Sequence, residues 1–138
     1  MKNILFLVAS LRKESLNMRL ARVTANNLPD GCGATFFDLK DVPMYNEDLR
    51  GDGSPESVRE LREALRSADG VFWTTPEYNY ALPGIVKNAI DWASRPMLPQ
   101  HSFVGKPMNA AVATISATNG IRSLNDLKRI GATAGDFR

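Results

Sequence analysis

The fold is decided near the start of the chain, where an apolar run, Ile4-Leu5-Phe6-Leu7-Val8-Ala9, leads directly into a polar stretch, Ser10-Leu11-Arg12-Lys13-Glu14-Ser15-Leu16-Asn17. A short continuous apolar run that ends at turn-forming residues is typical of a strand buried on both faces, as in a parallel sheet. Apolar residues then recur on one helical face between residues 16 and 28. The chain therefore begins with a strand–loop–helix unit.

The same alternation continues along the chain. We predict further strands at residues 34–39, 70–75 and 108–115, and further helices from residue 54 and at residues 83–93 and 121–130. Alternating strands and helices imply right-handed crossovers, and hence a parallel sheet with helices on both faces. We expect the strand order 2-1-3-4 and loops at residues 41–53 and 96–107. Residues 131–138 show no pattern and are a candidate for a disordered tail.

The length of 138 residues indicates a single domain, residues 1–138. The composition, with 43% apolar and 23% charged residues, is that of an ordinary soluble globular protein. The formal net charge of +2 is small and its lysines and arginines are scattered, which argues against a nucleic-acid partner. No apolar run approaches the ~20 residues of a membrane helix. The single cysteine, Cys32, excludes an internal disulfide and fits a cytoplasmic location.

The first loop has the chemistry of a phosphate site. It offers Ser10, Arg12, Ser15 and Asn17, together with the unpaired backbone N–H groups of a helix start. An arginine adds a charge-assisted contact to an anion. The alternative is a polar turn in which Ser15 only caps the helix. Neither the Walker pattern nor the dinucleotide fingerprint of glycines is present.

The second loop, Pro76-Glu77-Tyr78-Asn79-Tyr80-Ala81-Leu82-Pro83-Gly84, follows the third strand. Its prolines stiffen both ends, two tyrosines offer flat surfaces, and backbone N–H groups from Glu77 to Tyr80 can bond the polar edge of a ring. The alternative is a rigid loop that packs its tyrosines against a neighbour or a partner subunit. Because the first and third strands are neighbours in the expected sheet, both loops should meet at one cleft.

The remaining chemistry-bearing residues suggest neither a catalytic side chain nor a metal site. His101 is the only histidine and lies in a proline-rich segment, so no Ser/His/Asp triad or metal cluster can be built around it. Cys32 has no basic partner nearby in the sequence.

The two loops resemble those of the NAD(P)H-dependent FMN reductase family of flavodoxin-like proteins, which includes quinone, azo-dye and chromate reductases. Residues 10–17 look like its phosphate loop, and residues 76–80 with residues 83–92 look like its flavin-ring loop and the following helix. Residues 42–49 match the family's loop after the second strand. The resemblance covers residues 1 to about 130.

The resemblance implies a flavodoxin-like three-layer sandwich that binds FMN and uses NADPH or NADH as co-substrate. A hydride would pass from nicotinamide to flavin, and then to a quinone, free flavin, azo or metal-oxyanion acceptor. A homodimer or homotetramer is expected, with partner residues closing the site. Ser116 is a weaker candidate than Thr114 for the hydroxyl after the fourth strand. The implied cofactor-binding residues are Ser10, Arg12, Ser15, Leu16, Asn17, Pro76, Glu77, Tyr78, Asn79, Tyr80 and Thr114.

The sequence departs from the family pattern after the fourth strand. The family continues through another strand and a final helix, and we expect both to be missing here, which would leave the fourth strand as an edge. Two other functions therefore stay open: a flavodoxin-type electron carrier, and a truncated non-catalytic domain. The charge of +2 argues against the first, since electron carriers of this type usually have an acidic surface.

Overall fold

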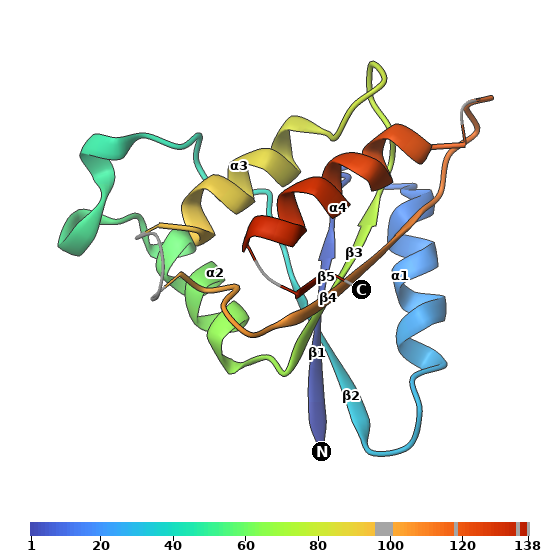
Figure 1. Ribbon diagram of the computed structural model, residues 1–138, viewed down its shortest axis with the longest axis horizontal. Helices are drawn as coiled ribbons and strands as arrows, with labels where there is room; N and C mark the ends of the chain where they lie inside the picture. The colour runs from blue at the N-terminus through green and yellow to red at the C-terminus, as the bar shows by residue number, and fades with distance from the viewer. Residues whose placement is uncertain (96–100, 118, 135, 138) are drawn as a thin grey trace.

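The computed structural model describes residues 1–95, 101–117, 119–134 and 136–137. Strands and helices alternate along the chain as the sequence predicts (Figure 1). In chain order, the elements are β1 (Lys2–Val8), α1 (Leu16–Asn26), β2 (Cys32–Phe37), α2 (Glu56–Ser67), β3 (Gly70–Thr75), α3 (Gly84–Ala93), β4 (Pro107–Val112), α4 (Ile121–Ala134) and β5 (Asp136–Phe137). Two 3₁₀ turns, Glu47–Leu49 and Gly51–Gly53, lie in the loop before α2.

The strands form one parallel sheet in the order β2-β1-β3-β4-β5. The register places Leu7 of β1 beside Phe37 of β2 and Trp73 of β3. The predicted order 2-1-3-4 is therefore confirmed. The carboxyl ends of β1 and β3 lie side by side, at the point where the chain changes its winding direction, which is where ligands bind in open sheets of this kind.

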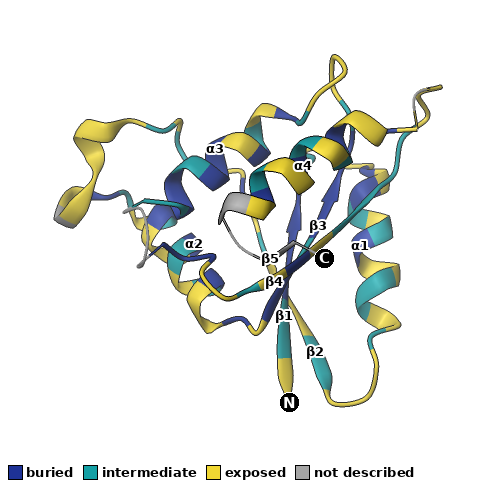
Figure 2. Cartoon of the chain, viewed as in Figure 1, coloured by how far each residue is buried: buried dark blue, intermediate teal, exposed yellow. Residues whose placement is uncertain are grey.

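Helices cover both faces of the sheet, as the three-layer prediction requires (Figure 1). On one face, Leu5, Leu7 and Trp73 pack against apolar side chains of α2, α3 and α4. On the other face, Phe6 and Val8 pack against α1. Alternate residues of β1 thus enter opposite layers, which explains why its apolar run is continuous. The carboxyl half of β1 is buried (Figure 2).

The structure corrects the expected end of the chain. A fifth strand is present, although β5 pairs only with Pro107 and Met108 at the beginning of β4. Likewise α4 continues to Ala134, so the residues after 130 are not a patternless tail. No helix follows β5 in the described residues. Of the expected loop at 96–107, residues 96–100 lie outside the described residues.

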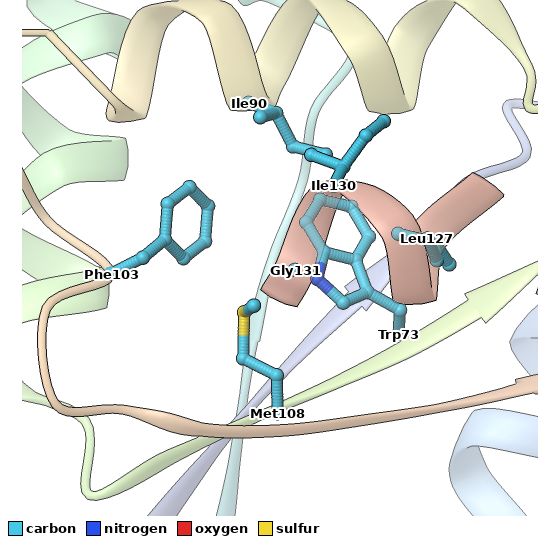
Figure 3. Close-up of a pocket in the computed structure, with 7 residues that line it drawn as sticks. All are labelled: Trp73, Ile90, Phe103, Met108, Leu127, Ile130 and Gly131. Carbon is cyan, nitrogen blue, oxygen red and sulfur yellow. The ribbon is translucent and has the colours of Figure 1, made fainter. Parts of the chain in front are cut away.

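A small apolar cavity lies between the sheet, α3 and α4 (Figure 3). Its volume is ≈ 10 Å³, and its lining includes Trp73, Phe103, Met108 and Leu127. A space of this size is about that of one water molecule, and its apolar lining offers a water no hydrogen bonds. The cavity is a packing defect rather than a ligand site. In the described part of the chain, no helix is long and apolar enough to cross a membrane.

Candidate functional site

A cleft of ≈ 300 Å³ lies at the carboxyl edge of the sheet, where three strand-to-helix segments converge. It is lined by the β1–α1 loop, by the beginning of the β3–α3 loop, and by residues 113–116 after β4. Of the predicted site residues, Asn79 and Tyr80 are not part of its lining. The other predicted residues line it together: Ser10, Arg12, Ser15, Leu16, Asn17, Pro76, Glu77, Tyr78 and Thr114.

The β1–α1 side of the cleft is the start of helix α1. Ser15 is buried at the N-cap of α1, and its Oγ accepts the Met18 N–H at 3.1 Å. Its own hydroxyl hydrogen can still be donated to a ligand. The first turn of α1 contains no acidic residue, and the exposed Arg12 stands beside it in the cleft lining. This end of the cleft therefore favours an anion.

Asn17 has a structural function that its sequence position did not reveal. Its side-chain amide donates to the Ala113 carbonyl at 2.9 Å and accepts the Ala113 N–H at 2.9 Å. The side chain is buried and ties the first turn of α1 to the segment after β4. Asn17 thus fixes the distance between two walls of the cleft.

The tip of the β3–α3 loop is a tight hairpin. The N–H of Tyr78 donates to the Ala81 carbonyl, and the N–H of Ala81 donates to the Tyr78 carbonyl, both at 3.1 Å. The central residues Asn79 and Tyr80 have φ values of 49° and 65°, as in a type I′ turn. Glycine usually occupies the second of these positions, so Tyr80 adopts a strained backbone conformation of the kind that is common at functional sites.

This hairpin determines which ring faces the cleft. Tyr78 is 48% exposed and lines the cleft, whereas Tyr80 is directed to the Arg122 guanidinium, which lies 5.0 Å from the Tyr80 ring centroid. Because the Tyr78 N–H is already bonded within the hairpin, this one of the four N–H groups expected to face a ring edge has a partner inside the loop.

Glu77 anchors the loop to the start of α4. Its Oε2 accepts the N–H of Arg122 at 3.0 Å and that of Ser123 at 3.4 Å. Its Oε1 lies 3.6 Å from the Arg122 guanidinium, and the Glu77 side chain is only 3% exposed. A buried carboxylate thus occupies the N-terminus of α4, where unpaired donors and the helix dipole favour it.

Two hydroxyls strengthen this connection from inside. The Ser123 Oγ donates to the Pro76 carbonyl at 3.0 Å and lies 3.3 Å from the Thr75 Oγ1. The Leu82 N–H donates to the Asp126 carboxylate at 3.4 Å. Sequence analysis did not identify Arg122, Ser123 or Asp126. The only available signal was a helix predicted to start at residue 121, which gave no indication that it touches the second loop.

The segment after β4 completes the cleft. Thr114 Oγ1 accepts the Ser116 N–H at 3.0 Å, which fixes the turn that leads to α4. Ser116 also lines the cleft, as do Ala113 and Ile115.

The loop after β2 is held by α3 rather than by the cleft. The Asn88 amide donates to the Pro43 carbonyl at 2.9 Å and accepts the Tyr45 N–H at 2.7 Å, and the Trp92 indole N–H donates to the same Pro43 carbonyl at 2.8 Å. Asn88 and Trp92 are one helical turn apart, so a single face of α3 fixes this loop.

The other chemistry-bearing side chains lie away from this cleft. His101 is buried, and its Nδ1 accepts the Phe103 N–H at 3.3 Å. Cys32 is a free thiol at the start of β2. Within the described ranges, no group of three or more His, Cys, Asp or Glu side chains could hold a metal ion.

Comparison with known proteins relates this geometry to a family. The chain is 42% identical over 114 residues to an NAD(P)H-dependent FMN reductase from Pseudomonas aeruginosa, an alignment that covers 83% of this chain and 60% of the relative. It is 38% identical over 129 residues to a quinone reductase of Escherichia coli, covering 92% of this chain and 68% of that protein. The chain thus spans about 60% of the length of the first of these relatives.

Solved structures agree. FerB, a flavoenzyme NAD(P)H:(acceptor) oxidoreductase from Paracoccus denitrificans, has a TM-score of 0.91 at 34% identity, over 100% of this chain and 75% of FerB. An azoreductase from Bacillus anthracis shares the fold, with a TM-score of 0.72 at 15% identity, over 100% of this chain and 83% of that one. The model of a family described as NADPH-dependent FMN reductase matches residues 2–136. The resemblance inferred from the two loops is therefore confirmed, and the chain belongs to the NADPH-dependent FMN reductase family.

Proposed function

We propose that the chain binds FMN in the cleft at the carboxyl edge of the sheet and acts as an NAD(P)H oxidoreductase toward a small-molecule acceptor. The observation that carries this proposal is the convergence of the two loops: Arg12 and Ser15 from one loop line the same cleft as Pro76 and Tyr78 from the other. The volume of ≈ 300 Å³ is at the lower end of the ~300–1,000 Å³ usual for ligand pockets.

The phosphate of FMN fits the α1 end of the cleft. The α1 start has unpaired N–H donors, the Ser15 hydroxyl, the Arg12 guanidinium and no carboxylate in its first turn. The starts of α2 and α4 differ, since Glu56 lies in the first turn of α2 and Glu77 occupies the start of α4. The first turn of α3 also has no acidic residue, but the start of α3 is not part of the cleft lining. The phosphate would thus be held where positive potential is not already neutralised.

The isoalloxazine ring fits the opposite end. The half-exposed Tyr78 supplies a flat surface, and the Thr114 hydroxyl and the backbone after β4 supply polar atoms around it. At the α1 end, Ser15 and Asn17 have fixed positions because both are buried and hydrogen-bonded, so that end of the cleft is preorganised.

When bound, FMN would supply the redox chemistry, which is hydride transfer from reduced nicotinamide and electron transfer to an acceptor. The protein's own contribution is to bind and orient. Arg12 and the α1 start would fix one end of the cofactor, while the Glu77-anchored loop would set the position of Tyr78. This division of labour needs no side chain as acid, base or nucleophile.

The acceptor, the assembly and the cellular location follow from the same proposal. A quinone is the favoured acceptor class, since relatives are named quinone reductases. Assembly as a homodimer or homotetramer would give the exposed hairpin at Asn79 and Tyr80 a partner to contact. One free cysteine among 138 residues fits a reducing cytoplasm.

A titration of the flavin-free protein tests the proposal. FMN and riboflavin are titrated into the unmodified protein, Arg12→Ala and the control Arg22→Ala, whose exposed side chain on α1 is not part of the cleft lining. A charge-assisted hydrogen bond of about 1.5–3 kcal/mol predicts that Arg12→Ala weakens FMN binding roughly tenfold or more. Riboflavin lacks the phosphate, so Arg12→Ala should leave the affinity for riboflavin unchanged.

Failure to bind FMN, or equal FMN affinities in Arg12→Ala and Arg22→Ala, would contradict the proposed site. Activity is then measured as NAD(P)H oxidation in the presence of a quinone. Flavin that binds but is not reduced by NADPH or NADH would identify an electron carrier instead. An oligomer that binds no flavin would identify a non-catalytic domain.

A further inference from the structure

A second cleft lies on the other side of the β1–α1 loop, between that loop and the end of β2. Its volume is ≈ 320 Å³. Ser10 and Arg12 line both this cleft and the proposed flavin cleft, so the two are separated only by the β1–α1 loop. We call this second space the β2 cleft. The proposed function does not use it.

The β2 cleft has an aromatic and apolar wall. Phe36 of the edge strand β2 lines it and is 45% exposed. The Phe36 ring stacks on the buried Phe6, with ring centroids 5.1 Å apart and an angle of 20° between the planes. Val8 and Met18 add apolar surface beside it. Such a wall suits a flat heteroaromatic ring, which would extend the existing stack.

The rim of the β2 cleft is charged. Arg12 and Lys40 contribute two positive charges, and Asp38 contributes one negative charge. The Asp38 Oδ1 accepts the Lys40 N–H at 3.0 Å, and the Lys40 Nζ lies 3.6 Å from the Asp38 Oδ2. Both side chains are more than half exposed, with values of 59% for Lys40 and 64% for Asp38, so a ligand can reach them.

An aromatic wall, a cationic rim and a carboxylate match the parts of an adenosine phosphate. The purine would stack on Phe36, the Asp38 carboxylate would accept from ribose hydroxyls, and Lys40 would contact phosphate oxygens. In nucleotide-binding α/β folds an acidic residue near the second strand often recognises the ribose hydroxyls. Asp38 directly follows β2, which ends at Phe37.

We propose that the β2 cleft binds the adenosine phosphate half of the nicotinamide dinucleotide. This inference rests on the proposed function, which requires that co-substrate. The shared wall formed by Ser10 and Arg12 lets one molecule pass over the β1–α1 loop, with its nicotinamide directed to the flavin cleft. The chain therefore carries its own dinucleotide-recognition surface next to the phosphate loop.

The test uses 2′,5′-adenosine diphosphate, which has adenine, ribose and two phosphates but no nicotinamide. Binding is measured by calorimetry on the full chain, with and without FMN, and located by amide chemical-shift changes. The variants are Phe36→Ala, Phe36→Leu and Lys40→Ala. The control is Lys128→Ala, an exposed lysine on α4 that does not line either cleft. Lys40 and Phe36 are both exposed enough that these changes should leave the core intact.

We expect shifts at residues 36–40, with Phe36→Ala weakening binding at least about fivefold, as for the loss of a stacked base. Phe36→Leu should give a smaller loss of the same kind, because it keeps the volume but not the ring. Lys40→Ala should weaken binding about threefold at low salt and less at high salt. Lys128→Ala should have no effect.

The inference is overturned if 2′,5′-adenosine diphosphate does not bind, if its shifts map to residues 76–78 and 113–116, or if the Phe36 and Lys40 variants bind like Lys128→Ala. The FMN titration distinguishes this failure from failure of the proposed function. If the protein binds FMN but not the adenosine phosphate, only the inference about the β2 cleft is refuted. If the protein binds the adenosine phosphate at Phe36 but does not bind FMN, the β2 cleft is supported as a binding site and the proposed flavin reductase function is refuted.

Discussion

The connection between Glu77 and α4 gives the sharpest prediction for this fold. The buried Glu77 carboxylate accepts two backbone N–H groups at the start of α4 and lies next to the Arg122 guanidinium. Replacing it perturbs both the helix start and the loop that carries Tyr78. We compare Glu77→Gln, which keeps an acceptor oxygen but removes the charge, with Glu77→Ala, which removes the acceptor as well.

The magnitudes follow from these contacts. A partly buried carboxylate at a helix N-terminus contributes up to about 2 kcal/mol. Since half of the Arg122 side chain is exposed, water can solvate it when its partner is lost, and the ion pair adds little. We expect Glu77→Gln to lower the free energy of unfolding by about 1–2 kcal/mol. Glu77→Ala also leaves the two N–H groups unpaired, at about 1–3 kcal/mol, for a total of about 2–4 kcal/mol.

The matched control is Glu56→Gln. Glu56 lies in the first turn of α2 and pairs with Arg59, so it repeats the same chemistry, but its side chain is 67% exposed. An exposed pair of this kind should contribute less than about 0.5 kcal/mol. Urea unfolding gives the free energies for Glu77→Gln, Glu77→Ala and Glu56→Gln. FMN titration of the same variants then shows whether loosening the loop also weakens FMN binding.

The reasoning is refuted if Glu77→Gln and Glu56→Gln unfold at the same urea concentration. That result would mean that burial of the Glu77 carboxylate adds nothing to the helix start. Destabilisation without any change in FMN affinity would show that Glu77 stabilises α4 but does not position the ring side of the cleft.

Two further predictions test the β4–α4 turn and the single histidine. Gly120 has a φ of +72°, and an added Cβ would lie 2.3 Å from the Val112 Cγ2 and 3.1 Å from its Cβ, so Gly120→Ala should destabilise by about 3 kcal/mol or more. Gly31→Ala, at a φ of +84° but with no atoms within 4 Å of the added Cβ, should lower the free energy of unfolding by about 1–2 kcal/mol. Equal losses for the two variants in urea unfolding would contradict the clash with Val112. Burial lowers the pKa of His101 from its ordinary value of 6.5, so the unfolded chain binds the proton first and stability should fall as the pH drops below 6.5. His101→Gln should make the urea midpoint depend less on pH between pH 7.5 and 5 (an assay range of about 2.5 pH units around the ordinary His pKa). An unchanged pH dependence would mean that other groups cause the loss of stability.

Much of the fold could be read from local patterns. The apolar run at residues 4–9 predicts a buried strand, and the structure has β1 at Lys2–Val8. The predicted cap Ser15 does cap α1. The boundaries of β2 and β4 shift by one to three residues, since the ends of these strands are set by pairing with their neighbours rather than by their own residues. The short β5 has too few residues to show a pattern and exists only because it pairs with β4.

The candidate site divides in a similar way. The sequence placed two loops at one cleft, because neighbouring parallel strands end at the same edge, and the cleft contains residues of both. It did not show that the Asn17 amide bonds Ala113, or that the Glu77 carboxylate turns to α4. Each of these contacts joins segments more than forty residues apart.

The sequence by itself determined the alternation of strands and helices, the sheet order and the kinds of side chain at its carboxyl edge, because these depend on periodicity and on near neighbours. Only the tertiary structure decided which polar groups remain for a ligand. Asn17, Glu77 and the Tyr78 N–H have hydrogen-bonding partners within the protein, whereas the lining of the cleft retains the Arg12 guanidinium and the Tyr78 ring. The physical reason is that a hydrogen bond depends on where distant segments meet in space, and residue order along the chain does not contain that distance.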